Sequence, residues 1–204
     1  MTGTLTSLMR IYLPLYVFLF FVISFLLPSY RTWRHTGINP VTFGKDDSAH
    51  AYIGLVMKAL IVLLFTNVVI FAIGIEIYMY LVPIWYLEIP VLDIIGLVLI
   101  HFSLAWIMIA QYQMSNNWRI GIDEKNKTQL VKDGVFKISR NPVFLGMMVS
   151  MLGLFLILPN VLSFFLMVAG YIVIQVQVRL EEEFLLRQHG KQYEDYKLRT
   201  RRWI

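Results

Sequence analysis

The chain has 204 residues, of which 58% are hydrophobic and 15% charged, and its mean hydropathy is +0.65. Soluble domains are about half apolar and a quarter charged, so this composition excludes a soluble or disordered chain and predicts a membrane protein. The absence of cysteine excludes disulfides, thiolate metal sites and a cysteine nucleophile. The net charge of +5 does not indicate nucleic-acid binding, because the basic residues lie between apolar segments.

Five stretches approach the roughly 20 apolar residues that a transmembrane helix requires. In chain order they are residues 11–27, 51–75, 89–111, 143–158 and 161–178. We expect the first to end at Pro28, and residues 76–88 are too few to cross the membrane. Because only Pro159 and Asn160 separate the last two stretches, these should form a tight helical hairpin.

The basic residues predict how the chain is oriented. With five spans, the segments 28–50, 112–142 and 179–204 share one face and carry 3, 6 and 7 of the 18 Lys and Arg residues. Cytoplasmic loops are enriched in these residues, so we predict this face to be cytoplasmic and the N-terminus to lie outside. The predicted fold is therefore an all-α polytopic membrane protein with about five transmembrane helices, a C-terminal helical hairpin and a cytoplasmic C-terminal helix.

The residues before the fourth span could bind an anion. Asn141 is a favourable N-cap and Pro142 suits the first helical position, so free backbone N–H groups should face the preceding loop beside Arg140. The alternative is an ordinary helix cap with an arginine that contacts lipid headgroups.

Three successive carboxylates, Glu181, Glu182 and Glu183, follow the fifth span. Acidic groups beside hydrocarbon are costly unless they are paired or functional, so they could bind a cationic ligand. The alternative is a solvated helix with Arg179–Glu182 and Glu183–Arg187 ion pairs, which ends at Gly190. We predict no metal site, because no two histidines have metal-ligand spacing. Small residues in the fourth span, Gly146, Ser150 and Gly153, are interpreted as packing contacts.

An ordered set of motifs at the basic face resembles the integral-membrane methyltransferases that include isoprenylcysteine carboxyl methyltransferases and phospholipid N-methyltransferases. The matching residues, which cover roughly 110–204, are Asn117, Trp118, Leu130, Val131, Gly134, Phe136, Arg140, Asn141, Pro142, Phe144, Gly146, Glu181, Glu182, Leu185, Gly190, Tyr193, Tyr196, Arg202, Trp203 and Ile204. Two positions depart from the family pattern, since Asn141 stands where many members have histidine and Phe144 replaces a common tyrosine. Asparagine cannot titrate near neutral pH, which argues against histidine acid–base chemistry there.

The resemblance implies an S-adenosylmethionine-dependent enzyme with a lipophilic or prenylated acceptor that arrives from the membrane lipid. It divides the chain into three N-terminal spans, 1–110, and a methyltransferase core, 111–204. By resemblance, Leu130, Val131, Gly134 and Val135 would line the adenosine end, Arg140, Asn141 and Pro142 would bind the polar end, and Glu181 and Glu182 the methionine amine or ribose. Arg140 and Glu182 are the expected catalytic residues, with Glu182 as the base for an amine acceptor.

Isoprenylcysteine-type carboxyl O-methylation leads these expectations. Methylation of a phospholipid or a small apolar metabolite on nitrogen, sulfur or oxygen is an alternative. An NADPH-dependent sterol-type membrane reductase and a non-enzymatic membrane scaffold stay open as well, and the oligomeric state is not evident from the sequence.

Overall fold

The computed structural model describes residues 3–42, 48–122, 126 and 129–204, and this part of the chain is all-α, with two isolated β-bridges as its only strand-type pairings. The longer elements are α1 (Gly3–Phe21), a π-helix (Val22–Leu26), α2 (Leu27–Thr36), α3 (Ala49–Ile73), α4 (Ile75–Tyr78), α5 (Pro90–Met114), α6 (Pro142–Ile157), α7 (Val161–His189) and α8 (Lys191–Arg199). Single 3-10 turns lie at Met79–Leu81, Trp85–Leu87, Ser115–Asn117 and Gly134–Lys137.

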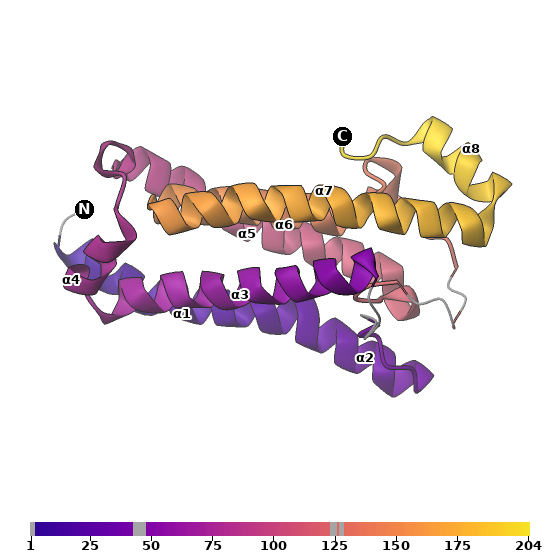
Figure 1. Ribbon diagram of the computed structural model, residues 1–204, viewed down its shortest axis with the longest axis horizontal. Helices are drawn as coiled ribbons and strands as arrows, with labels where there is room; N and C mark the ends of the chain where they lie inside the picture. Colours follow the sequence, from indigo (N-terminus) through magenta and orange to yellow (C-terminus); the bar gives the residue numbers. More distant parts are fainter. Residues whose placement is uncertain (1–2, 43–47, 123–125, 127–128) are drawn as a thin grey trace.

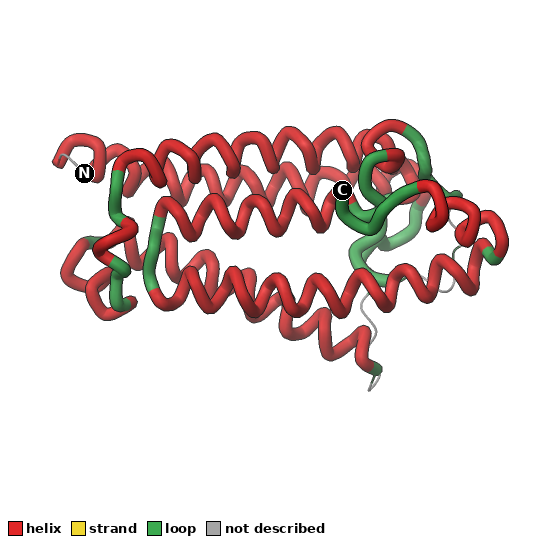
Figure 2. The backbone as a smooth tube through the Cα atoms, turned by 90° about the horizontal axis from the view of Figure 1, so that it is seen from above, coloured by secondary structure: helices red, strands yellow, loops and turns green. Residues whose placement is uncertain are grey.

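The long helices run side by side along one axis, and the connecting loops gather at the two ends of the bundle (Figure 1, Figure 2). Within the described residues, four helices are long and apolar enough to cross a membrane: Ser7–Thr36, Ala49–Ile73, Pro90–Met114 and Val161–His189. The fifth apolar helix, α6, has 16 residues and is therefore about 24 Å long. The chain is thus a multi-pass, all-α membrane protein, as its composition predicts.

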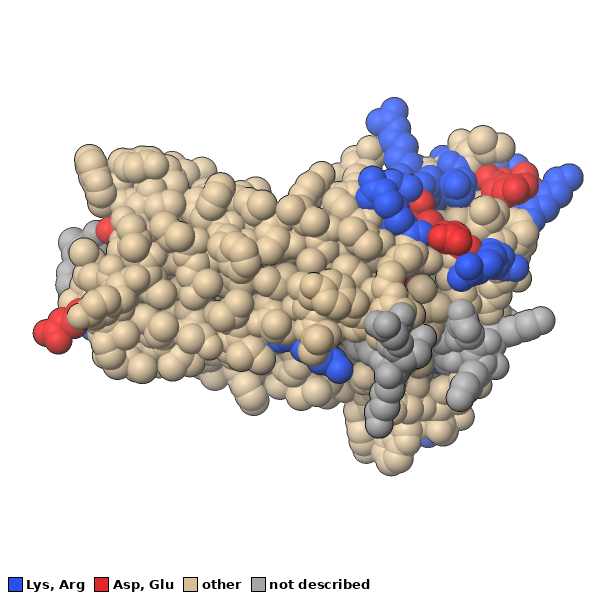
Figure 3. All heavy atoms as spheres, in the orientation of Figure 1, with Lys and Arg blue, Asp and Glu red and all other residues tan. Residues whose placement is uncertain are grey.

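Basic side chains gather at the end of the bundle where α7 ends and α8 packs, whereas the opposite end displays acidic side chains (Figure 3). The C-terminus and α2 lie toward this basic end, and the N-terminus lies at the other (Figure 1). The helices therefore place the three basic segments of the sequence at one end, which is the arrangement that the five-span prediction requires.

The prediction that the first helix ends at Pro28 is wrong. The helix continues through the π-helix Val22–Leu26 into α2. Pro28 lies in the first turn of α2, and Gly37 caps the end of α2. Proline lacks the N–H group that would bond the carbonyl four residues earlier, here Ser24. The Gln111 side chain donates to that carbonyl instead, with Nε2 2.5 Å from the Ser24 oxygen. A side chain from α5 thus satisfies the backbone group that Pro28 leaves without a donor.

Close contact between α5 and α6 depends on glycine. A Cβ atom on Gly153 would lie 2.9 Å from the Gly96 carbonyl oxygen and 2.7 Å from Ile100 Cγ2. One on Gly146 would lie 2.5 Å from Ile107 Cγ1. Gly146 and Gly153 therefore let two helices approach closely, which confirms the packing role of these two residues, whereas Ser150 lines a cavity.

The predicted hairpin between α6 and α7 is confirmed. Asn160 begins α7 with a capping box, in which its Oδ1 accepts from the Ser163 N–H at 2.8 Å and the Ser163 hydroxyl accepts from the Asn160 N–H at 3.1 Å. Asn160 Nδ2 donates to Asn67 Oδ1 at 3.0 Å, so the turn is also fixed to α3.

The fifth span and the acidic segment after it form one helix. α7 has 29 residues, about 43 Å, which exceeds the roughly 30 Å hydrocarbon thickness of a bilayer. It ends at Gly190, whose φ of +52° disfavours other residues, and α8 turns back from there. The end of α7 and α8 together form the predicted C-terminal helical segment beyond the span.

Candidate functional site

The C-terminal chain after α8 returns to the loop that precedes α6. The Arg140 N–H donates to the Arg201 carbonyl at 3.0 Å, and the Ser139 hydroxyl donates to the Arg202 carbonyl at 3.1 Å. Arg140 Nη1 donates to the Thr200 carbonyl at 2.6 Å. These contacts bring residues near 140 and residues near 202 to one place.

Glu182 lies at the centre of this contact and is 6% exposed. It accepts from Arg140 Nη2 at 3.0 Å and from Arg202 Nη2 at 2.8 Å, and both guanidinium groups donate a second bond through Nε. Asn141 Nδ2 donates as well, at 3.2 Å. The hydrogen bonds to Glu182 raise the pKa of Arg202 above its ordinary value. A buried carboxylate with two cationic partners stays ionised and fixes the shape of the site.

Three local predictions are corrected or confirmed here. Asn141 precedes α6, but its side chain makes no cap hydrogen bond, and its Nδ2 donates to Glu182. The predicted Arg179–Glu182 pair is wrong, since Glu182 points to Arg140 and Arg202 while Arg179 donates to Gln175. The Glu183–Arg187 pair is confirmed at 3.3 Å on the exposed side of the helix.

Two tyrosines of α8 pack next to this network and hold α8 against the turn at Gly134–Lys137. Tyr193 is buried and its ring lies 6.1 Å from that of Tyr196. The Tyr196 hydroxyl donates to the Phe136 carbonyl at 2.6 Å, and burial raises its pKa above the ordinary value of 10. The hydroxyl is therefore a neutral donor at physiological pH, and the spacing of Tyr193 and Tyr196 after Gly190 serves packing.

A polar cleft opens beside the network. We call it the polar cleft. Apolar side chains form part of its wall, and amide, guanidinium and carboxylate groups form the rest. Its principal lining residues are Met114, Asn117, Arg119, Gln129, Leu130, Val131, Arg140, Glu181 and Tyr196.

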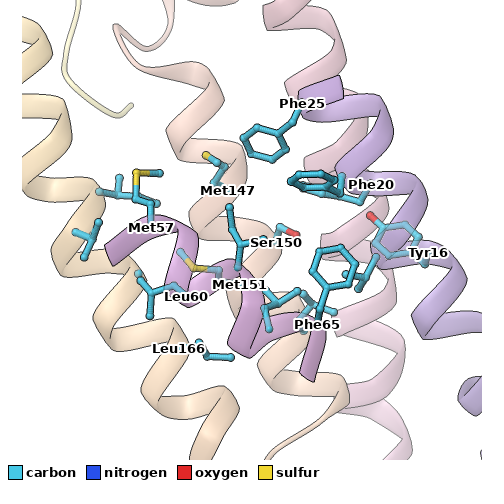
Figure 4. A pocket seen from close by; sticks show the side chains of 18 residues that line it. Tyr16, Phe20, Phe25, Met57, Leu60, Phe65, Met147, Ser150, Met151 and Leu166 are labelled. Carbon is cyan, nitrogen blue, oxygen red and sulfur yellow. The ribbon is translucent and has the colours of Figure 1, made fainter. Parts of the chain in front are cut away.

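Two further cavities lead from this cleft into the bundle. One, which we call the junction chamber, shares Arg140 and Glu181 with the polar cleft and is also lined by Asn141, Pro142 and Gln177. The other, an apolar pocket, lies between α1, α3, α6 and α7 (Figure 4). The chamber and the pocket share Phe25, Met57 and Met147, so the three cavities adjoin one another in series.

The sequence-predicted site residues occupy different parts of this arrangement. Leu130, Val131, Arg140 and Glu181 line the polar cleft, and Asn141 and Pro142 line the junction chamber. Gly134, Val135 and Glu182 line none of the three described cavities. Gly134 is a turn residue with φ +61° against Gln113, Val135 is a core residue, and Glu182 lies in the ion-pair network.

Gln177 and Arg119 are two of the lining residues that the sequence did not predict. Gln177 is 1% exposed, lies one helical turn before Glu181 and donates to Glu181 Oε1 at 2.8 Å. A single amide among apolar residues of a span is the signal that could have identified it. Arg119 lines both the polar cleft and the junction chamber, and its isolated position in a loop gave no comparable signal.

The basic end thus combines a polar cleft, a fixed Arg–Glu–Arg network and an apolar pocket between helices. A comparison with the curated proteins finds no match. A family model, described as phospholipid methyltransferase, matches residues 91–192, half of the chain. This stretch contains α5, α6, α7 and the cleft-lining loop between α5 and α6. The chain therefore belongs to the phospholipid methyltransferase family and is a membrane methyltransferase.

Proposed function

We propose that this protein transfers a methyl group from S-adenosylmethionine to a lipophilic acceptor at the membrane surface. One observation carries the proposal: the polar cleft adjoins, through the junction chamber, an apolar pocket between the membrane-spanning helices. A water-soluble methyl donor and a membrane-soluble acceptor need such adjoining compartments. Catalysis then rests on aligning the two reactants and excluding water.

The donor set of the polar cleft fits S-adenosylmethionine. Leu130 and Val131 offer an apolar wall for the adenine ring, and the amide side chains of Asn117 and Gln129 line the same cleft. The guanidinium groups of Arg119 and Arg140 suit the methionine carboxylate, and the Glu181 carboxylate suits a cationic group. When bound there, the cofactor would supply an activated methyl group on a sulfonium.

Arg140 and Glu182 act in this proposal by positioning the site. Glu182 accepts five hydrogen bonds, four of them from arginines, so it is a weak proton acceptor. Its role is to orient Arg140 at the wall of the cleft and to attach the C-terminal chain over the site. This replaces the sequence-based expectation that Glu182 is the base.

The acceptor is proposed as a lipophile whose tail occupies the apolar pocket. Carboxyl O-methylation of an isoprenylcysteine, as expected from the resemblance, stays a prediction, as does methylation of a phospholipid or a small apolar metabolite. We also propose that the basic end is cytoplasmic and the N-terminus outside, because Lys and Arg gather at the end of the bundle where α7 ends and α8 packs (Figure 3).

Calorimetry with S-adenosylhomocysteine and detergent-purified protein tests the cofactor assignment. We expect micromolar binding to the wild type, loss of binding for Leu130→Trp, which fills the polar cleft, and retained binding for Leu154→Trp, which fills the apolar pocket. Equal effects of the two substitutions, or no binding by folded wild-type protein, would contradict the proposal. Binding of NADPH in place of S-adenosylhomocysteine would favour the reductase alternative, and binding of neither would favour a scaffold.

A further inference from the structure

Five consecutive residues between α5 and α6 form a wall that two cavities share. We call residues 118–122 the wall segment. Arg119 and Gly121 line both the polar cleft and the junction chamber, Trp118 and Ile120 line the chamber, and Ile122 lines the cleft. Gly121 has a φ of +95°, a left-handed conformation that other residues rarely adopt, so it presents bare backbone to both cavities. The conformation of this short segment therefore helps to set the shape of both cavities.

The first anchor of the wall segment comes from the chain that follows α2. Ile120 and Val41 form an isolated parallel β-bridge. The Ile120 N–H donates to the Pro40 carbonyl at 2.8 Å, and the Ile120 carbonyl accepts from the Thr42 N–H at 2.9 Å and from the Thr42 hydroxyl at 3.1 Å. Three hydrogen bonds thus fix Ile120 to residues in the N-terminal half of the chain.

The second anchor is His50, on the other side of Gly121. His50 lies in the first turn of α3, and its Nε2 atom accepts from the Ile122 N–H at 3.0 Å. Because a backbone N–H group only donates, this bond requires the Nε2 atom of His50 to carry no hydrogen. The Trp118 indole N–H also donates to the Ser29 hydroxyl of α2, at 3.3 Å. The wall segment is thus attached to α2, to α3 and to residues 40–42.

Order in the wall segment before binding favours a ligand that contacts it. A segment that becomes ordered only when the ligand arrives subtracts its conformational entropy from the binding free energy. Between residues 118 and 122 the backbone is neither helix nor sheet, apart from the isolated bridge at Ile120, so contacts with neighbouring elements determine its order. Without the His50 acceptor, the Ile122 N–H would lose this bond and the wall segment would lose its anchor to α3.

We propose that His50 is a positioning residue for the methyl donor, because it holds the wall segment in the conformation that S-adenosylmethionine binds, with Pro40 and Thr42 as the other anchor. The inference rests on the proposed function. It extends the donor site to the N-terminal half of the chain, where the sequence predicted no site residue. His50 lines none of the three described cavities, so its effect passes through the Ile122 backbone.

Calorimetry with S-adenosylhomocysteine and detergent-purified protein tests the role of His50. His50→Phe keeps a ring and removes the acceptor, so we expect it to weaken binding about three- to tenfold. His50→Gln keeps an acceptor oxygen and should bind within about twofold of the wild type. His35→Phe is the matched control, because His35 is an exposed histidine in the last turn of α2, and it should leave binding unchanged. Equal affinities of the wild type and His50→Phe, or equal losses in His50→Phe and His50→Gln, would overturn the proposal.

Thr42→Val tests the other anchor, so the test does not depend on a single variant. Valine keeps the shape of the side chain and the backbone N–H but removes the hydroxyl that donates to the Ile120 carbonyl. We expect S-adenosylhomocysteine to bind about two- to fivefold more weakly. Thr66→Val removes an exposed hydroxyl that donates to the Val62 carbonyl within α3, and it should change nothing. Equal affinities of these two variants would refute the anchoring role of Thr42.

Amide hydrogen exchange separates a local effect of His50 from a general loss of stability. In His50→Phe, a peptide that covers residues 118–122 should exchange about three- to tenfold faster than in the wild type, whereas the hairpin at residues 157–163 should exchange at the same rate. Faster exchange of both regions, or of neither, would overturn the positioning role. Failure of the folded wild type to bind S-adenosylhomocysteine would refute the proposed function. Binding that His50→Phe leaves unchanged refutes this inference alone.

Discussion

Removing the carboxylate of Glu182 tests whether the Arg–Glu–Arg network stabilises the basic end. In Glu182→Gln, the guanidinium groups of Arg140 and Arg202 would face a neutral amide that cannot compensate either charge. Glu182 is 6% exposed and receives five hydrogen bonds, so the loss is that of a buried partner. Such losses cost about 3–5 kcal/mol, whereas an exposed helical ion pair is worth about 0.3–0.5 kcal/mol.

Thermal unfolding in detergent provides the assay, with Glu183→Gln as the control because the Glu183–Arg187 pair is exposed. At roughly 2–4 °C per kcal/mol for a chain of this size, we expect Glu182→Gln to lower the Tm by roughly 6–20 °C. The control should lower it by no more than about 2 °C. If both variants unfolded within a degree of each other, the network would contribute nothing and the positioning role of Glu182 would be refuted.

Four other outcomes follow from the structure. Gln111→Leu should lower the free energy of unfolding by about 1–3 kcal/mol, because the Ser24 carbonyl loses its hydrogen-bond donor. Adding Pro28→Ala should restore about 1 kcal/mol, because alanine returns the backbone N–H that proline lacks. If the double variant unfolded at the same temperature as Gln111→Leu alone, this pairing would be contradicted. Gly153→Ala should lower the free energy of unfolding by about 1–3 kcal/mol, because the new Cβ atom meets the Gly96 carbonyl. Gly170→Ala should lower it by less, because the Cβ atom there meets only the flexible Met151 side chain. The reverse order of the two Tm values would contradict this packing. Asn160→Ala should cost about 1–2 kcal/mol from the lost capping box, and an unchanged Tm would argue against that cap. Tyr196→Phe should lower the free energy of unfolding by about 1 kcal/mol at both pH 6 and pH 9. Burial raises the pKa of Tyr196, so the hydroxyl keeps its proton, and its hydrogen bond, until the pH rises above 10. If the stability difference between wild type and variant became smaller between pH 6 and pH 9, this reasoning would be refuted.

The sequence predicted the architecture well because hydropathy and turn residues determine it directly. The hairpin at Pro159 and Asn160 and the end of α7 at Gly190 are determined by residues that lie next to each other in the sequence. The end of the first helix could not be predicted in this way. A proline usually ends a helix. Here Gln111, which lies 83 positions after Pro28, supplies the hydrogen-bond donor that the Ser24 carbonyl would otherwise lack. A tertiary contact therefore overrides the local signal.

The sequence pointed to residues that the fold brings to one end of the bundle, but not to how they divide between the ion-pair network and the cavities. The pattern of two adjacent glutamates identified Glu181 and Glu182 together, yet helix geometry turns them about 100° apart. One meets Arg140 and Arg202, and the other meets Gln177 and the cavities. The arginines that contact Glu182 depend on how the C-terminal chain folds back, and the spacing of residues in the sequence does not predict that path.

Methyl transfer into membrane lipid tests the central claim most directly. Membranes that contain the wild-type protein or Leu130→Trp are incubated with S-adenosylmethionine carrying a radioactive methyl group, and the organic-soluble products are counted. The account predicts label in the lipid extract with the wild-type protein and only background label with Leu130→Trp, whose polar cleft is filled. Equal label from both proteins, or no label from wild-type protein that binds S-adenosylhomocysteine, would contradict it.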